Sequence, residues 1–82
     1  MMDATTRARL LSIVTEYDIR ESKKKYWNHY ALGHYCKAID NVAEAMAGGM
    51  SIEDALPEGF CGSLLRHVAK KLGLTVEYSK FL

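Results

Sequence analysis

The sequence has little of what marks a secreted, membrane-spanning or disordered chain. It contains one proline and two cysteines, and no apolar run approaches the roughly 20 residues that cross a bilayer. No apolar leader precedes the charged opening at residues 3–7, so we expect a cytoplasmic protein with free thiols and no membrane association. Neither sign of charge dominates: 11 basic and 10 acidic residues give a net charge of +1. Any attraction to nucleic acid must therefore be local.

Length and composition favour one small folded domain covering residues 1–82. The 82 residues are too few for two independent cores. Hydrophobic residues make up 49% of the chain and charged residues 26%, close to the average for globular proteins, which argues against disorder. A domain this short buries only about 60–65% of its unfolded surface, so a bound partner or a second copy would add needed stability.

The spacing of apolar residues predicts an all-α fold, a compact bundle of three to four helices with a short extended C-terminal tail. Apolar residues recur at intervals of three and four along much of the chain. We expect helices over residues 4–17, 22–47 and 60–72, with a short helical turn at 52–56 and antiparallel connections. Residues 75–78 alternate as a strand does, and are interpreted as a docked tail or an edge for a partner.

Several residues mark where these helices start. Asp3 or Thr5 can cap the first helix, and Ser51 can cap the short turn, because their side-chain oxygens accept a bond from an exposed backbone N–H. Asp18 followed by Glu21 has the spacing of a reciprocal cap. The sequence therefore allows a second helix to begin at Asp18.

Glycines mark where the helices end. Gly48 and Gly49 are expected to stop the helix that precedes them, and Gly73 is expected to stop the last helix, with Leu74 folding back onto it. Gly33 lies inside a helical pattern, where glycine costs about 1 kcal/mol relative to alanine. We interpret Gly33 as a sign either of a helix start nearby or of close packing between backbones, and we favour close packing.

The most unusual segment joins three consecutive lysines to several aromatic rings. Tyrosine and tryptophan are frequent at binding hot spots, and lysine beside aromatics also suits contact with phosphates and stacked bases. With the basic outer face of the last predicted helix, this segment supplies the candidate binding residues: Lys23, Lys24, Lys25, Tyr26, Trp27, His29, Tyr30, Arg66, Lys70 and Lys71. The alternative is that Tyr26 and Tyr30 pack in the core while the lysines form a solvated face.

No motif indicates catalysis, a metal site or a cofactor. His29, His34 and Cys36 do not share the i, i+4 helical face that a two-ligand site needs, and neither cysteine has a neighbouring cysteine. Cys61 with His67 is a pair that any chain of this composition offers. Phosphate loops and nucleophile elbows are absent from the sequence. We therefore predict a protein that is not an enzyme and holds neither metal nor cofactor.

Residues 68–75 resemble the first helix and turn of a helix-turn-helix DNA reader. That family has a small residue four positions before the turn glycine, here Ala69 and Gly73. The sequence departs from the pattern at Ser79, where the family has a buried aliphatic residue, and Leu82 comes before a recognition helix is complete. The resemblance implies a partial reading element, which cannot read bases in that way. The plain alternative is a helix stop followed by an extended tail.

Residues 30–35 and 64–74 are similar to segments of small uncharacterised proteins of phages and plasmids. The resemblance implies an accessory protein of a mobile element. Some such proteins are similar in size to inhibitors of host defence complexes such as CRISPR effectors. The resemblance identifies no binding residue in this sequence.

These observations give three functional hypotheses. The leading one is a phage or plasmid accessory protein that inhibits or regulates a host protein or nucleoprotein complex by surface binding through residues 23–35. The second, from another class, is a small nucleic-acid-binding transcriptional regulator with these phosphate contacts: Arg20, Lys23, Lys24, Lys25, Arg66, Lys70 and Lys71. The third is a homodimer formed through exposed helix faces or tail edges, and it is compatible with the other two.

Overall fold

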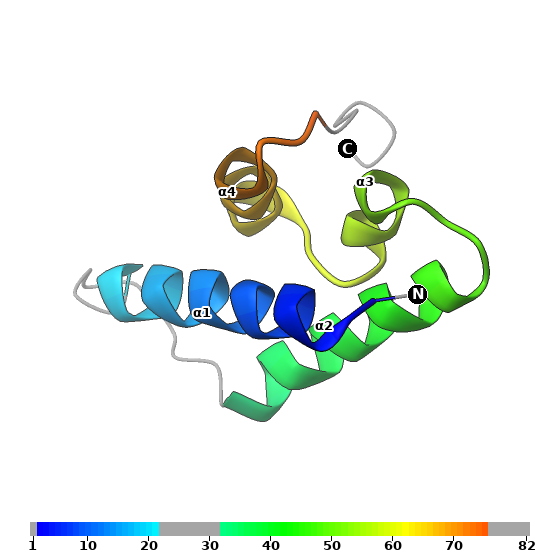
Figure 1. Ribbon diagram of the computed structural model, residues 1–82. Helices are drawn as coiled ribbons and strands as arrows, with labels where there is room; N and C mark the ends of the chain where they lie inside the picture. Colours follow the sequence, from blue (N-terminus) through cyan, green and yellow to red (C-terminus); the bar gives the residue numbers. More distant parts are fainter. Residues whose placement is uncertain (1, 22–31, 76–82) are drawn as a thin grey trace.

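The described part of the chain is all-α. The computed structural model describes residues 2–21 and 32–75, and no strand occurs in those two ranges. α1 packs against both α2 and α4, while α3 and η1 pack against α2 (Figure 1). The predicted helical bundle is confirmed. Its elements are α1 (Ala4–Glu21), α2 (Leu32–Ala47), α3 (Ile52–Ala55), the 3-10 turn η1 (Leu56–Glu58) and α4 (Gly62–Leu72).

The first helix begins where the sequence predicts and ends later than expected. The Asp3 carboxylate accepts a hydrogen bond from the Thr6 backbone N–H at 2.7 Å, which confirms the cap and lowers the Asp3 pKa. The helix break expected at Asp18 is wrong, because α1 continues to Glu21. Asp18 instead accepts a hydrogen bond from the Tyr35 hydroxyl of α2 at 2.8 Å. A tertiary contact thus takes the carboxylate that a cap would have used.

Glycine exits end α2 and α4 as predicted. Gly49 has a φ of 109° and Gly73 a φ of 70°, both in the left-handed region that favours glycine. After Gly73, the Leu74 backbone N–H donates to the Ala69 carbonyl at 2.9 Å, and the Leu74 side chain packs against the core. The Ser51 cap is also confirmed, since its hydroxyl accepts a bond from the Asp54 N–H at 3.3 Å.

The close packing predicted for Gly33 occurs instead at Gly59. A Cβ placed on Gly33 meets no atom of the described residues within 4 Å, so they show no close packing there; α2 instead begins one residue earlier, at Leu32, as the alternative interpretation expects. A Cβ on Gly59 would collide with the Ala38 carbonyl oxygen and lie 2.8 Å from Val42 Cγ2. Gly59 therefore lets the connection between η1 and α4 lie directly on α2.

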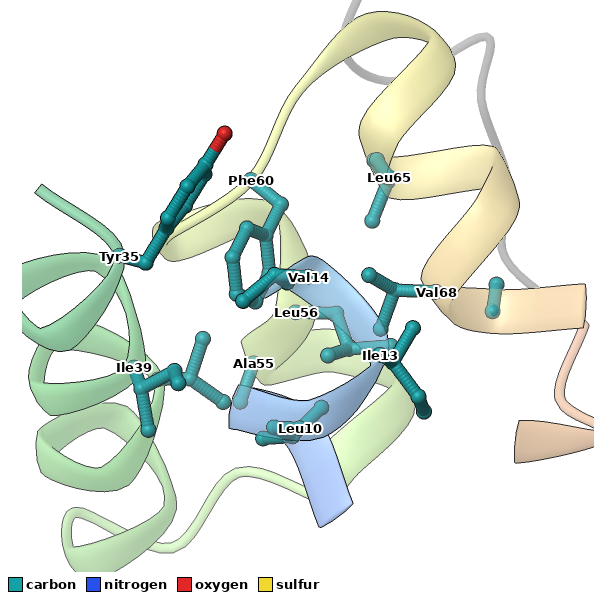
Figure 2. Close-up of a cluster of buried hydrophobic side chains, with 12 residues drawn as sticks. Leu10, Ile13, Val14, Tyr35, Ile39, Ala55, Leu56, Phe60, Leu65 and Val68 are labelled. Carbon is teal, nitrogen blue, oxygen red and sulfur yellow. The ribbon is translucent and has the colours of Figure 1, made fainter. Parts of the chain in front are cut away.

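One cluster of buried side chains draws on every helical element (Figure 2). Ala8, an apolar residue of the first helix, is exposed. Two residues turn a helix by about 200°, which places Ala8 opposite Leu10. The buried cluster consists of Leu10, Ile13, Val14, Tyr35, Ile39, Val42, Ala55, Leu56, Phe60, Leu65, Val68 and Ala69.

None of the described helices has the length and apolar character to cross a bilayer.

Candidate binding surface

The candidate binding residues fall into two sets. Arg66, Lys70 and Lys71 are all exposed on α4, as the sequence predicts. At the described end of the segment 23–35, His34 is exposed but Tyr35 is buried, so Tyr35 belongs to the core. The other seven candidates lie outside the described residues, as does the tail predicted after residue 75: Lys23, Lys24, Lys25, Tyr26, Trp27, His29 and Tyr30.

Basic residues of α1 and of α4 lie near one another where the two helices pack. The Arg9 guanidinium donates to the Lys71 carbonyl oxygen at 3.0 Å, which ties α1 to the last turn of α4. Arg20 lies over the Tyr17 ring, 5.4 Å from its centroid. We call Arg9, Arg20, Lys70 and Lys71 the basic seam. All of its members are exposed.

His67 lies within the basic seam as a neutral group. Its ring centroid is 5.0 Å from that of Tyr17, and its Nε2 atom is enclosed without a hydrogen-bond partner among the residues that the structure describes. Burial lowers the pKa of His67, and the positive charges of Arg20, Lys71 and Lys70 lower it further, against a smaller opposing effect of Glu16.

The lowered pKa makes folding stability depend on pH. The folded-state pKa of His67 lies below its ordinary value of 6.5, so the unfolded chain takes up the proton first. The stability that the neutral form of His67 contributes is complete above about pH 7. It is lost as pH falls from about 6.5 through the lower folded-state pKa. We expect the urea midpoint of the wild type to fall between pH 7.5 and 5.5.

Two variants test whether His67 or another titrating group causes the pH dependence of the urea midpoint. His67→Gln should show a weaker fall in urea midpoint over that pH range, whereas His34→Gln, at an exposed position, should behave as wild type. Unfolding followed by circular dichroism at both pH values provides the measurement. Equal pH dependence in all three proteins would show that His67 does not cause it.

Glu16 lies on the same flank of α1 as Arg9 and Arg20, but five of the acidic side chains lie on another part of the molecule. From residue 38 to residue 65 the chain has no lysine or arginine, and this stretch forms most of α2 together with α3 and η1. The resulting separation of charge explains how a chain of net charge +1 carries a local basic patch. Its five acidic residues, all exposed, are Asp40, Glu44, Glu53, Asp54 and Glu58.

A pocket of about 380 Å³ adjoins the basic seam. Tyr17 from α1 forms one wall, and His34, Tyr35 and Ala38 from α2 form another. Residues 59–64, which connect η1 to α4 and begin that helix, supply the rest. We call it the Tyr35–Phe60 pocket after two of its three buried rings, which lie beside each other in Figure 2.

The hydroxyl groups in the pocket wall already have partners. The Tyr17 hydroxyl and Ser63 Oγ are 2.8 Å apart and share a hydrogen bond. The Tyr35 hydroxyl donates to Asp18, as described above. These two bonds fix both tyrosine rings, so the pocket has defined walls before any ligand binds.

The pocket contains a thiol and an imidazole, but not the catalytic pair considered from the sequence. Cys61 precedes α4, is exposed, and lines the pocket together with His34. The described lining residues include neither His67 nor a carboxylate. Among the described residues no group of three histidine, cysteine or acidic side chains is placed to hold a metal ion. Whether the protein is an enzyme stays a prediction.

A second hollow, of about 490 Å³, runs along the outer face of α1. All of its described walls come from that one helix, including Ile19, which is 57% exposed. Homodimerisation through exposed helix faces stays a prediction, and light scattering would test it by giving the mass in solution.

Sequence reasoning named Arg20 of α1 as a phosphate contact, but it missed Arg9 and did not connect α1 with α4. Arg9, Glu16 and Arg20 fall along one flank of α1 when the helix is drawn at 100° per residue, and this signal was available. No signal in the sequence indicated that these residues lie near Lys70 and Lys71, because this proximity depends on which flank of α1 packs against α4.

Comparison of the chain with protein-family models, with curated proteins and with solved structures finds no match. The function is therefore inferred from the geometry of the basic seam and the Tyr35–Phe60 pocket.

Proposed function

We propose that the protein is a non-enzymatic interaction protein that inhibits or regulates a larger host complex by surface binding. The supporting observation is the basic seam: burial and the charges of Arg20, Lys71 and Lys70 lower the pKa of His67, and Arg9 donates to the Lys71 carbonyl oxygen. A concentrated positive patch speeds association with an acidic partner and sets the register of docking. An origin in a phage or plasmid rests on the resemblance of residues 30–35 and 64–74.

A pair of matched charge reversals tests this proposal. Lys71→Glu places a negative charge in the basic seam, whereas Lys37→Glu makes the same change on α2, outside the seam; both lysines are exposed. We expect Lys71→Glu to weaken binding to the partner about tenfold, mainly through slower association, and Lys37→Glu to change it less than threefold.

The measurement begins with capture of the partner from host lysate by the tagged wild-type protein and its identification by mass spectrometry. Association and dissociation rates of the purified partner are then measured by biolayer interferometry with the three proteins. Equal rates for wild type and Lys71→Glu would remove the basic seam from the binding surface.

The second candidate is a nucleic-acid-binding regulator, which the basic seam also supports. Each phosphate neutralised on duplex DNA contributes a slope of about −0.9 to the plot of log K against log salt, so several contacts give a steep line. Anisotropy titrations of a labelled DNA duplex at several salt concentrations measure this slope. A slope near zero would reject this candidate, because few or no phosphates would then be neutralised.

A further inference from the structure

The Tyr35–Phe60 pocket is held open by the core. Tyr35 is only 5% exposed and Phe60 only 4%, and both belong to the buried cluster that includes Ile39 and Leu56. Gly59 holds the adjoining connection against the backbone of α2. A pocket whose walls are fixed in this way needs little rearrangement to accept a ligand, so more of the contact energy appears as affinity.

The chemistry of the walls favours an apolar occupant. The hydroxyls of Tyr17, Tyr35 and Ser63 are already hydrogen-bonded within the chain. A nucleobase entering the pocket would carry several donors and acceptors, and each one buried without a partner costs about 1–3 kcal/mol. A phenylalanine or leucine side chain brings no such group. The volume of about 380 Å³ is near the lower limit for ligand pockets and suits one large side chain.

The charge beside the pocket identifies what should flank that side chain. Tyr17 forms part of the pocket wall, and its ring also contacts the guanidinium of Arg20 at 5.4 Å and the ring of His67 at 5.0 Å. The basic seam therefore lies directly beside the pocket wall. The carboxylate of Asp18, two residues before Arg20 in the chain, accepts a hydrogen bond from the Tyr35 hydroxyl. Carboxylates of a partner would complement the seam while an apolar neighbour filled the pocket.

From this geometry we infer that the Tyr35–Phe60 pocket receives one large apolar side chain from an acidic segment of a partner protein. The inference rests on the proposed function, because the basic seam holds the acidic residues on either side of the anchor. The pocket supplies the buried hot spot and the seam supplies the polar rim, the usual division within a protein interface.

Two acidic peptides that differ only in their central residue, phenylalanine or alanine, test the inference. Each is acetylated, amidated and titrated into the ¹⁵N-labelled full chain. We expect the phenylalanine peptide to shift the amides of Tyr35, Phe60 and Leu64 as well as those of Lys70 and Lys71. The alanine peptide should shift only the seam amides and bind about tenfold more weakly, because it lacks the buried side chain.

A pair of alanine substitutions on α2 provides the matched control. Ala38 lines the pocket, and Ala43 does not appear in its described wall; both side chains are half-buried. Ala38→Leu should fill the pocket and bring the affinity for the phenylalanine peptide down to that for the alanine peptide. Ala43→Leu should leave the tenfold difference unchanged. Circular dichroism verifies folding, and the comparison of the two peptides on wild type needs no variant.

The outcomes distinguish the two proposals. Equal affinity of the two peptides, with seam shifts alone, would overturn the pocket inference and leave the proposed function standing. Pocket shifts without seam shifts would count against the seam and hence against the proposed function. A single-stranded oligothymidine that shifts the pocket amides, where the phenylalanine peptide does not, would also overturn the inference by making a base the occupant.

Discussion

Replacing Gly59 by alanine is expected to destabilise the fold by about 3 kcal/mol, near the upper end for overpacking. The backbone of Gly59 has φ −118° and ψ −26°, which alanine adopts readily, so the loss comes from collision and not from backbone strain. The obstacle is the Ala38 carbonyl oxygen, a backbone atom that cannot rotate away. A domain of 82 residues has a stability of roughly 4–12 kcal/mol, so this single methyl group removes much of it.

The same substitution at Gly33 provides the control. Gly33 lies in α2 with open space around the position of a Cβ, so Gly33→Ala should stabilise the protein by about 0.5–1 kcal/mol through helix propensity. Urea unfolding followed by circular dichroism measures both free energies of unfolding. If Gly59→Ala proves as stable as wild type, the connection between η1 and α4 does not lie against α2 as described.

Leu10→Ala is expected to cost about 3 kcal/mol. The Leu10 side chain is 0% exposed and lies in the cluster where α1 meets the other helices (Figure 2). Truncation removes the transfer free energy of the buried methyl groups and leaves a cavity that the surrounding helices fill only in part. At about 4–8 °C per kcal/mol for a domain of this size, the melting temperature should fall by roughly 12–24 °C.

Ile19→Ala, on the same helix, separates burial from helix propensity. Ile19 is 57% exposed, so its truncation should change the free energy of unfolding by less than about 0.5 kcal/mol. Thermal unfolding of the two variants provides the comparison. Similar losses at both positions would mean that α1 presents a different face to the core.

The helices and most of their ends were predictable, because they depend on interactions within a few residues. The Asp3 cap, the Ser51 cap and the left-handed glycines after α2 and α4 each involve groups no more than about five positions apart. The break predicted at Asp18 failed for the opposite reason. Its carboxylate bonds to Tyr35, which is 17 residues away, and local spacing contains no information about that partner.

The candidate site was predictable in its α4 half and at Arg20. The spacing of Arg66, Lys70 and Lys71 places them on an exposed helix face without reference to any other element. Arg9 and Arg20 carry a similar local signal but no indication that α4 lies beside them. The Tyr35–Phe60 pocket had no sequence signal, because it exists only where three separate segments meet.

The sequence by itself determined that the described chain forms helices, where several of them start or stop, and which faces carry apolar or basic side chains. These properties follow from hydrogen bonds and side-chain periodicity that repeat within one or two turns. The tertiary structure decided which glycine meets a neighbouring backbone, which flank of α1 meets α4, and where a pocket opens. Each of these is set by contacts between residues distant in the chain, and their geometry depends on how all the helices pack at once.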